Sequence, residues 1–215
     1  MQDRINPFRK AGIALLIIGI IDIGVMAFCI VNKVSYSSSF NIFAVIAGIF
    51  LIRGGVKTAR AVRWLSIFFV AAFIGFLVLS PFIIPFGLLL TTLKLNTLTM
   101  VSSFLSGLVF IAVLIWIHLQ LSTPESLERL AQAGFKTGKP KSAYLAGGAL
   151  VTVLITLLFG LMNGASAQKA KALAQEQLGP GFQYHVSSMS TSGNSGSADV
   201  TAYSDKEIYR VQVQW

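Results

Sequence analysis

The chain has 215 residues, of which 54% are hydrophobic and only 12% are charged, and its formal net charge is +9. Soluble domains carry about a quarter charged residues, so this composition excludes an ordinary soluble protein and predicts a membrane protein. The single cysteine, Cys29, excludes an intrachain disulfide. The two histidines, His118 and His185, lie far apart without neighbouring cysteines, so neither a metal site nor a cofactor is predicted.

Five uncharged stretches are candidates for membrane-crossing helices, which need about 20 mainly apolar residues each. They cover residues 11–31, 38–52, 64–85, 98–118 and 143–162. The second is short and begins in the polar sequence SYSSSF, so its first turn is expected at the interface or in a thinned bilayer. The predicted fold is therefore a membrane all-α domain of five transmembrane helices over residues 1–163, followed by a small α+β tail over residues 164–215.

Asp22 is the one charged residue in the first predicted span. A carboxylate at the bilayer centre costs about 2.5–3.5 kcal/mol, so Asp22 should face the other helices and be protonated or hydrogen-bonded. Thr152 and Ser106 lie at similar depth in later spans and are its predicted partners. Two roles stay open for this intramembrane carboxylate: a structural hydrogen bond, or proton handling in transport.

Prolines interrupt the third stretch. Residues 64–93 contain no charge, but Pro81 and Pro85 remove backbone donors and disfavour helix in the residues before them. The helix should therefore kink or stop near Ser80. Residues 86–95 are then predicted to form an interfacial or partly re-entrant helix.

Lysine and arginine are distributed unevenly between the loops, and such cations stay on the cytoplasmic side. Eleven fall on one side of the five-span arrangement: Arg4, Arg9, Lys10, Arg53, Lys57, Arg60, Arg63, Arg129, Lys136, Lys139 and Lys141. The other side has Lys33 and Lys94. This asymmetry predicts a bacterial inner-membrane protein with a cytoplasmic N-terminus and an extracytoplasmic C-terminus. It also explains the basic net charge without a nucleic-acid partner, although these loops are expected to touch anionic headgroups non-specifically.

Between the last two spans, the sequence STPESLERLAQAGF has the signals of a short helix. Ser122 or Thr123 can cap it, Pro124 suits its first turn, and Gly134 can end it. Leu127 and neighbouring apolar residues form one side, which is expected to rest on the inner membrane surface. The cationic sequence RGGVKTARAVRW follows the second predicted span. It lacks phosphate-loop spacing and predicts a tight turn.

The tail predicts a helix over residues 165–178 and a three-stranded antiparallel meander. Strand alternation places Tyr209 and Trp215 on one apolar face, where they are predicted to close a small core or contact a partner. The sequence SDKE predicts a hairpin turn, and STSGNSGS a longer, mobile loop. A span followed by such a module resembles the layout of cytochrome oxidase assembly factors over the last quarter of the chain. Cleavage after Ala167 is an alternative to retention of the tail, and retention is favoured.

Function is predicted only as a class. The sequence contains no GxSxG, HExxH or paired-carboxylate pattern, which argues against an enzyme. We expect a non-enzymatic, multi-pass inner-membrane protein with an accessory, assembly or protein-interaction role through its tail, where it contacts a protein partner or a second copy. The alternative is a small-solute or proton-coupled transporter centred on Asp22.

Overall fold

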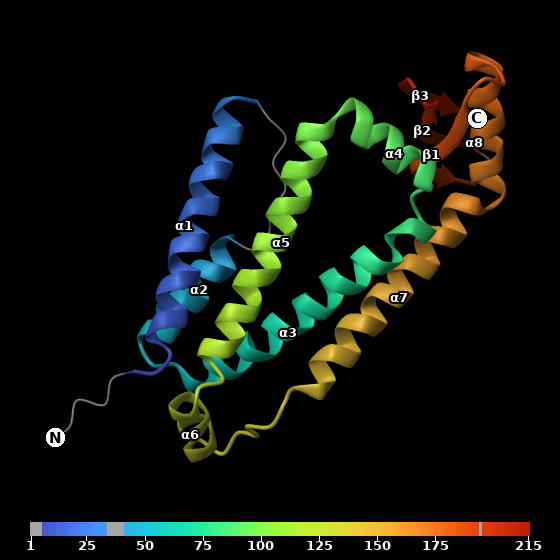
Figure 1. The fold of residues 1–215 in the computed structure, drawn as a ribbon. Coiled ribbons are helices and arrows are strands. Elements are labelled where there is room, and N and C mark those ends of the chain that lie inside the picture. Colours follow the sequence, from blue (N-terminus) through green and yellow to red (C-terminus); the bar gives the residue numbers. More distant parts are fainter. Residues whose placement is uncertain (1–5, 34–40, 194) are drawn as a thin grey trace. The chain divides into compact units, whose positions relative to one another are not determined.

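The computed structural model describes residues 6–33, 41–193 and 195–215, which form helices and one C-terminal sheet (Figure 1). The helices are α1 Arg9–Val31, α2 Asn41–Ile52, α3 Val56–Leu79, α4 Phe86–Leu95, α5 Thr97–Gln120, α6 Pro124–Gln132, α7 Lys141–Asn163 and α8 Ala165–Leu178. A 3₁₀ turn, η1 Ser80–Phe82, follows α3. The strands are β1 Gln183–Ser192, β2 Ser195–Tyr203 and β3 Ile208–Gln214.

Four helical segments of the described chain are long and apolar enough to cross a membrane. They are α1, α3 with η1, α5 and α7, with 23, 27, 24 and 23 residues. At about 1.5 Å per residue, each exceeds the roughly 30 Å of a hydrocarbon core. Large apolar side chains stand exposed along them, including Phe28 at 66% and Leu145 at 74%. Lipid rather than water accommodates such surfaces, so these four helices are compatible with a multi-pass membrane protein.

The second predicted span is where the structure and the sequence differ most. Of residues 38–52, the structure has a helix only over Asn41–Ile52, and residues 38–40 lie outside the described chain. Twelve residues make a helix about 18 Å long, which is too short to cross the bilayer by itself. The described residues therefore contain four helices of spanning length, and the fifth crossing is not confirmed.

The third span begins earlier than predicted and ends as predicted. α3 starts at Val56 rather than near residue 64, because its first turns are built from Lys57, Arg60 and Arg63. Lys and Arg are good helix formers whose long side chains keep their charges outside the lipid, so counting uncharged residues missed them. α3 ends at Leu79, and α4 begins after Pro85, which confirms the proline break near Ser80 and the helix over residues 86–95.

The contacts divide the chain into two compact units: Met1–Ala71 with Phe110–Gly147, and Ala72–Val109 with Gly148–Trp215. The core of the first unit joins the ends of several helices to α6 and consists of Phe8, Ala11, Leu51, Ala59, Ile117, Leu121 and Leu130. α6 is capped by Thr123, whose hydroxyl accepts from the backbone N–H of Ser126, as predicted. Its apolar side, however, packs on this protein core through Leu130 and Leu127, so the expectation that this side rests on lipid was wrong.

α1 and α2 lie antiparallel within the first unit and approach closely at two glycines (Figure 1). A Cβ atom on Gly12 would lie 2.9 Å from the carbonyl oxygen of Gly48, and one on Gly48 would lie 2.8 Å from that of Gly12. Small residues at such positions allow two helix backbones to pack directly. The C-terminal end of α2 thereby lies beside the N-terminal end of α1.

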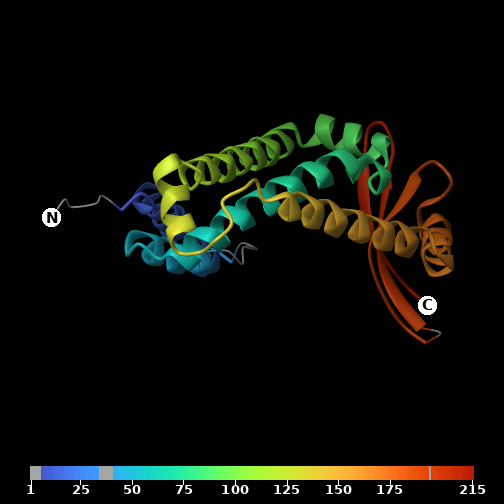
Figure 2. The same ribbon diagram turned by 90° about the horizontal axis from the view of Figure 1, so that it is seen from below.

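The second unit contains the tail, in which β1, β2 and β3 form an antiparallel sheet in sequence order. α8 lies along one face of the sheet, and Ala167, Ala170 and Ala174 pack on Val186, Val200 and Val213 (Figure 2). The predicted helix and meander are thus confirmed, and Ser204 and Glu207 close the predicted SDKE turn. The predicted long loop at STSGNSGS was wrong, because β1 runs to Ser192 and β2 starts at Ser195. Gly193, at φ 60°, supplies the left-handed backbone that a short hairpin requires.

Replacing Gly12 with Ala should loosen the α1–α2 pair, since the new methyl group would overlap backbone atoms of α2. We expect a loss of about 1–3 kcal/mol in the free energy of unfolding in detergent micelles. Gly24→Ala is the matched control, because a Cβ atom there has nothing within 4 Å on the same helix α1. Equal thermal unfolding temperatures for the two variants would contradict the close contact.

Candidate functional site

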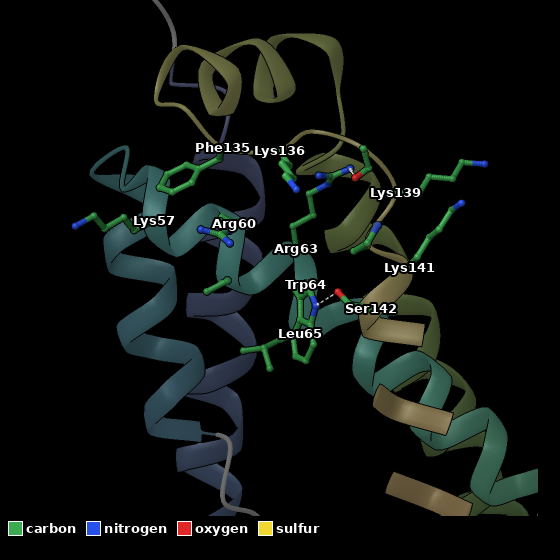
Figure 3. Close-up of a pocket in the computed structure, with 13 residues that line it drawn as sticks. Lys57, Arg60, Arg63, Trp64, Leu65, Phe135, Lys136, Lys139, Lys141 and Ser142 are labelled. Carbon is green, nitrogen blue, oxygen red and sulfur yellow. Dashed lines mark hydrogen bonds between the residues drawn. The ribbon is translucent and has the colours of Figure 1, made fainter. Parts of the chain in front are cut away.

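A cavity of about 880 Å³ lies in the first unit, between the N-terminal half of α3 and the connection from α6 to α7 (Figure 3). Its lining includes six cationic side chains: Lys57, Arg60, Arg63, Lys136, Lys139 and Lys141. None of the described residues lining it is Asp or Glu. Apolar groups complete the wall, namely Trp64, Leu65, Phe135 and Pro140. The cavity is therefore both strongly cationic and partly apolar.

Helical spacing explains the contribution of α3 to this cavity. Lys57, Arg60 and Trp64 follow one another at intervals of three and four residues, so they share one side of the helix. Figure 3 shows the amines of Lys57, Lys139 and Lys141 extending outwards, while Arg63 turns towards the chain after α6. Five of the six cations are exposed, and Arg63 is buried at 8% exposure.

Arg63 holds the segment that forms the opposite wall. Its Nη2 donates to the carbonyl oxygens of Thr137 at 3.0 Å and Gly138 at 3.2 Å, and its Nε donates to Ser122 Oγ at 2.9 Å. The planar guanidinium can satisfy three acceptors in fixed directions, which a lysine ammonium on a flexible stem does less well. Arg63 is thus a structural residue that positions its neighbours.

Two further contacts join α3 to the same wall. The guanidinium of Arg60 lies over the ring of Phe135, with its carbon 4.9 Å from the ring centroid. Trp64 Nε1 donates to Ser142 Oγ at 3.0 Å, at the start of α7 (Figure 3). The cationic lysines of residues 136–141 are therefore attached at both ends to one helix.

His118 belongs to this structural network. Its Nδ1 lies 3.1 Å from the carbonyl oxygen of Arg63, and its Nε2 lies 3.4 Å from Ser122 Oγ. His185 lies in the tail, where burial, with a smaller effect from Lys171, lowers the pKa of the imidazole. Among the described residues, no group of three His, Cys, Asp or Glu side chains could hold a metal ion.

Asp22 lies on α1 and is partly buried. The hydroxyls of its predicted partners bond to their own helices: Thr152 donates to Gly148 at 3.0 Å, and Ser106 to Ser102 at 2.8 Å. A hydroxyl that donates in this way can still accept a hydrogen bond from a protonated carboxyl group. The functional role of Asp22 therefore stays a prediction.

Trp215 packs inside the tail rather than standing free. Its backbone N–H and carbonyl pair with Gly196 at 2.9 and 2.8 Å, and its indole ring covers that glycine. Tyr209 is 45% exposed, and its hydroxyl donates to Glu207 at 2.7 Å. This bond raises the pKa of Tyr209. Of the two predicted contact residues, Tyr209 offers the larger exposed surface.

The structure also reveals a contact between α4 and the tail that the sequence did not predict. Thr91 is 3% exposed, and its hydroxyl lies 2.9 Å from the carbonyl oxygen of Ser204 and 3.0 Å from that of Gly87. A Cβ atom on Gly87 would lie 3.2 Å from the ring of Tyr203. Gly87 and Thr91 are four residues apart and so share one side of α4. The sequence shows this spacing, but it does not show that the tail packs against that side.

Comparison with protein-family models, with curated proteins and with solved structures finds no match for this chain.

Replacing Arg63 with Ala should release the wall formed by residues 136–141. Hydrogen bonds from a charged group contribute about 1.5–3 kcal/mol, so we expect a several-fold faster tryptic cleavage at Lys136 and Lys139 in detergent. Arg63→Lys should give an intermediate rate. The control is Arg53→Ala, which removes an exposed cation outside the cavity. Equal cleavage rates in Arg53→Ala and Arg63→Ala would contradict the role of Arg63 in holding this wall.

Proposed function

We propose that this chain is a non-enzymatic accessory or assembly protein whose membrane helices hold the C-terminal tail for contact with another protein or a second copy. The observation that carries the proposal is the attachment of the tail at two points. The tail follows α7 directly, with Gly164 before α8, and Thr91 of α4 also bonds to the β2–β3 turn. A module held twice keeps a defined direction relative to α4, which suits a contact surface.

The face of the sheet opposite α8 is the surface available for such contact. Alternation directs Val200, Val211 and Val213 towards α8, so Asp199, Arg210 and Gln212 point away and are exposed. By the same alternation Tyr209 belongs to the face of Val211 and Val213, but at the start of β3 its ring is 45% exposed, and tyrosine is enriched at protein interfaces. A polar sheet face with an exposed tyrosine near the start of its last strand is typical of a non-obligate protein interface.

The proposal includes five crossings of a bacterial inner membrane, with the N-terminus cytoplasmic and the C-terminus outside. The Gly12–Gly48 contact supports it, because it places the C-terminal end of α2 beside the N-terminal end of α1. A second crossing would likewise return the chain to the side on which α1 begins. The cations of Arg9, Arg53 and Lys139 then fall on one side, as the positive-inside rule favours.

A topology reporter tests this orientation. A reporter enzyme that is active only outside the cytoplasm should be active when fused after Trp215 and inactive when fused after Lys57. The opposite pair of activities, or equal activity at the two sites, would exclude the five-crossing orientation.

Site-specific photo-crosslinking tests the contact surface in intact membranes. A photoreactive residue at Tyr209 should yield a discrete crosslinked adduct, while one at the exposed Glu176 of α8 should not. Gly87→Leu should weaken the adduct several-fold by displacing Tyr203, and Gly107→Leu, at an open helical position, should leave it unchanged. Two results together would instead favour the transporter hypothesis. One is the absence of an adduct at Tyr209, and the other is a loss of transport activity in a stable Asp22→Asn variant but not in a variant without the tail.

A further inference from the structure

The cationic cavity has a chemistry that anchoring and topology do not require. The positive-inside rule explains why cations lie on this side, but not why α3 and residues 135–142 converge on one cavity. Its volume of about 880 Å³ lies within the range of small-molecule pockets. Like charges repel at close range, and no described lining residue supplies a carboxylate to offset them. An anion inside the cavity would remove this repulsion.

We infer that this cavity binds the phosphate-containing headgroup of an anionic phospholipid. The exposed cations Arg60, Lys139 and Lys141 supply the phosphate contacts, since their charges are not committed to described carboxylates. The amines of Lys139 and Lys141 extend outwards in Figure 3, and their flexible stems allow them to turn towards a bound phosphate. Arg63 has a different role, because its guanidinium is already bonded to Ser122, Thr137 and Gly138. It keeps the two walls at the spacing that a headgroup needs.

The apolar part of the lining favours a lipid over a soluble phosphate. Trp64 and Leu65 line the cavity and also begin the uncharged part of α3, which continues into the membrane-spanning region. Leu65 is 40% exposed, so an acyl chain could continue along α3 from the same opening. A cavity with cations at one side and a lipid-facing helix at the other matches the two parts of a phospholipid.

A charge-matched pair of variants tests the inference in the full-length protein in detergent. The cavity variant is Arg60→Gln/Lys139→Gln/Lys141→Gln. The control is Arg9→Gln/Lys10→Gln/Arg53→Gln, which removes three exposed cations that do not line the cavity. Native mass spectrometry measures retention of phosphatidylglycerol, phosphatidylcholine and inorganic phosphate. We expect the parent and the control to retain phosphatidylglycerol over phosphatidylcholine, and the cavity variant to bind phosphatidylglycerol about tenfold more weakly.

The other outcomes overturn the inference in distinguishable ways. An equal loss of phosphatidylglycerol binding in the two triple variants would show a general effect of charge rather than a binding site. Competition by inorganic phosphate at the concentrations at which phosphatidylglycerol binds would identify a soluble anion as the ligand. The single variant Lys139→Glu repeats the test if the triple variant does not fold, because the Lys139 side chain is exposed and makes no hydrogen bond to another described residue. Unchanged phosphatidylglycerol binding in this variant would also overturn the inference.

Discussion

The packing of α6 against the ends of α1, α2, α3 and α5 is the interaction on which the cationic cavity depends. Leu121 and Leu130 are almost fully buried among Phe8, Leu51, Ala59 and Ile117, so the ends of α1, α2, α3 and α5 meet α6 in one apolar cluster. Burying side chains of this size away from water contributes about 1.5–3 kcal/mol each. Because α6 is fixed there, the chain that leaves it must pass beside α3 before entering α7.

That constraint explains why a buried arginine is tolerated at Arg63. The residues after α6 have carbonyl groups without helical partners, and the guanidinium binds those of Thr137 and Gly138. A buried charge is costly unless hydrogen bonds compensate it. Here the compensation also fixes the segment that carries Lys136, Lys139 and Lys141. The apolar cluster positions the wall coarsely, and Arg63 sets its distance from α3.

The sequence predicted those parts of the fold that a single physical requirement determines. α1, α5 and α7 follow the apolar runs closely, because the bilayer demands both length and apolarity. The tail helix and its strands follow from local periodicity. The polar strand ends around Ser192 and Ser195 were missed, since serines beyond the core resemble a loop. The cavity was missed for another reason: its cations were visible in the sequence, but only tertiary contacts bring Arg60 near residues 135–142.

The α4–tail contact shows why a polar residue in an apolar helix need not indicate chemistry. Thr91 is buried in a helix that is otherwise mostly apolar, and its hydroxyl shares a proton between its own helix and the carbonyl of Ser204. An unpaired buried hydroxyl costs about 1–3 kcal/mol, so separation of the tail from α4 would cost at least part of that. Close approach at Gly87 makes the same contact sensitive to shape. Together they couple the direction of the sheet to α4.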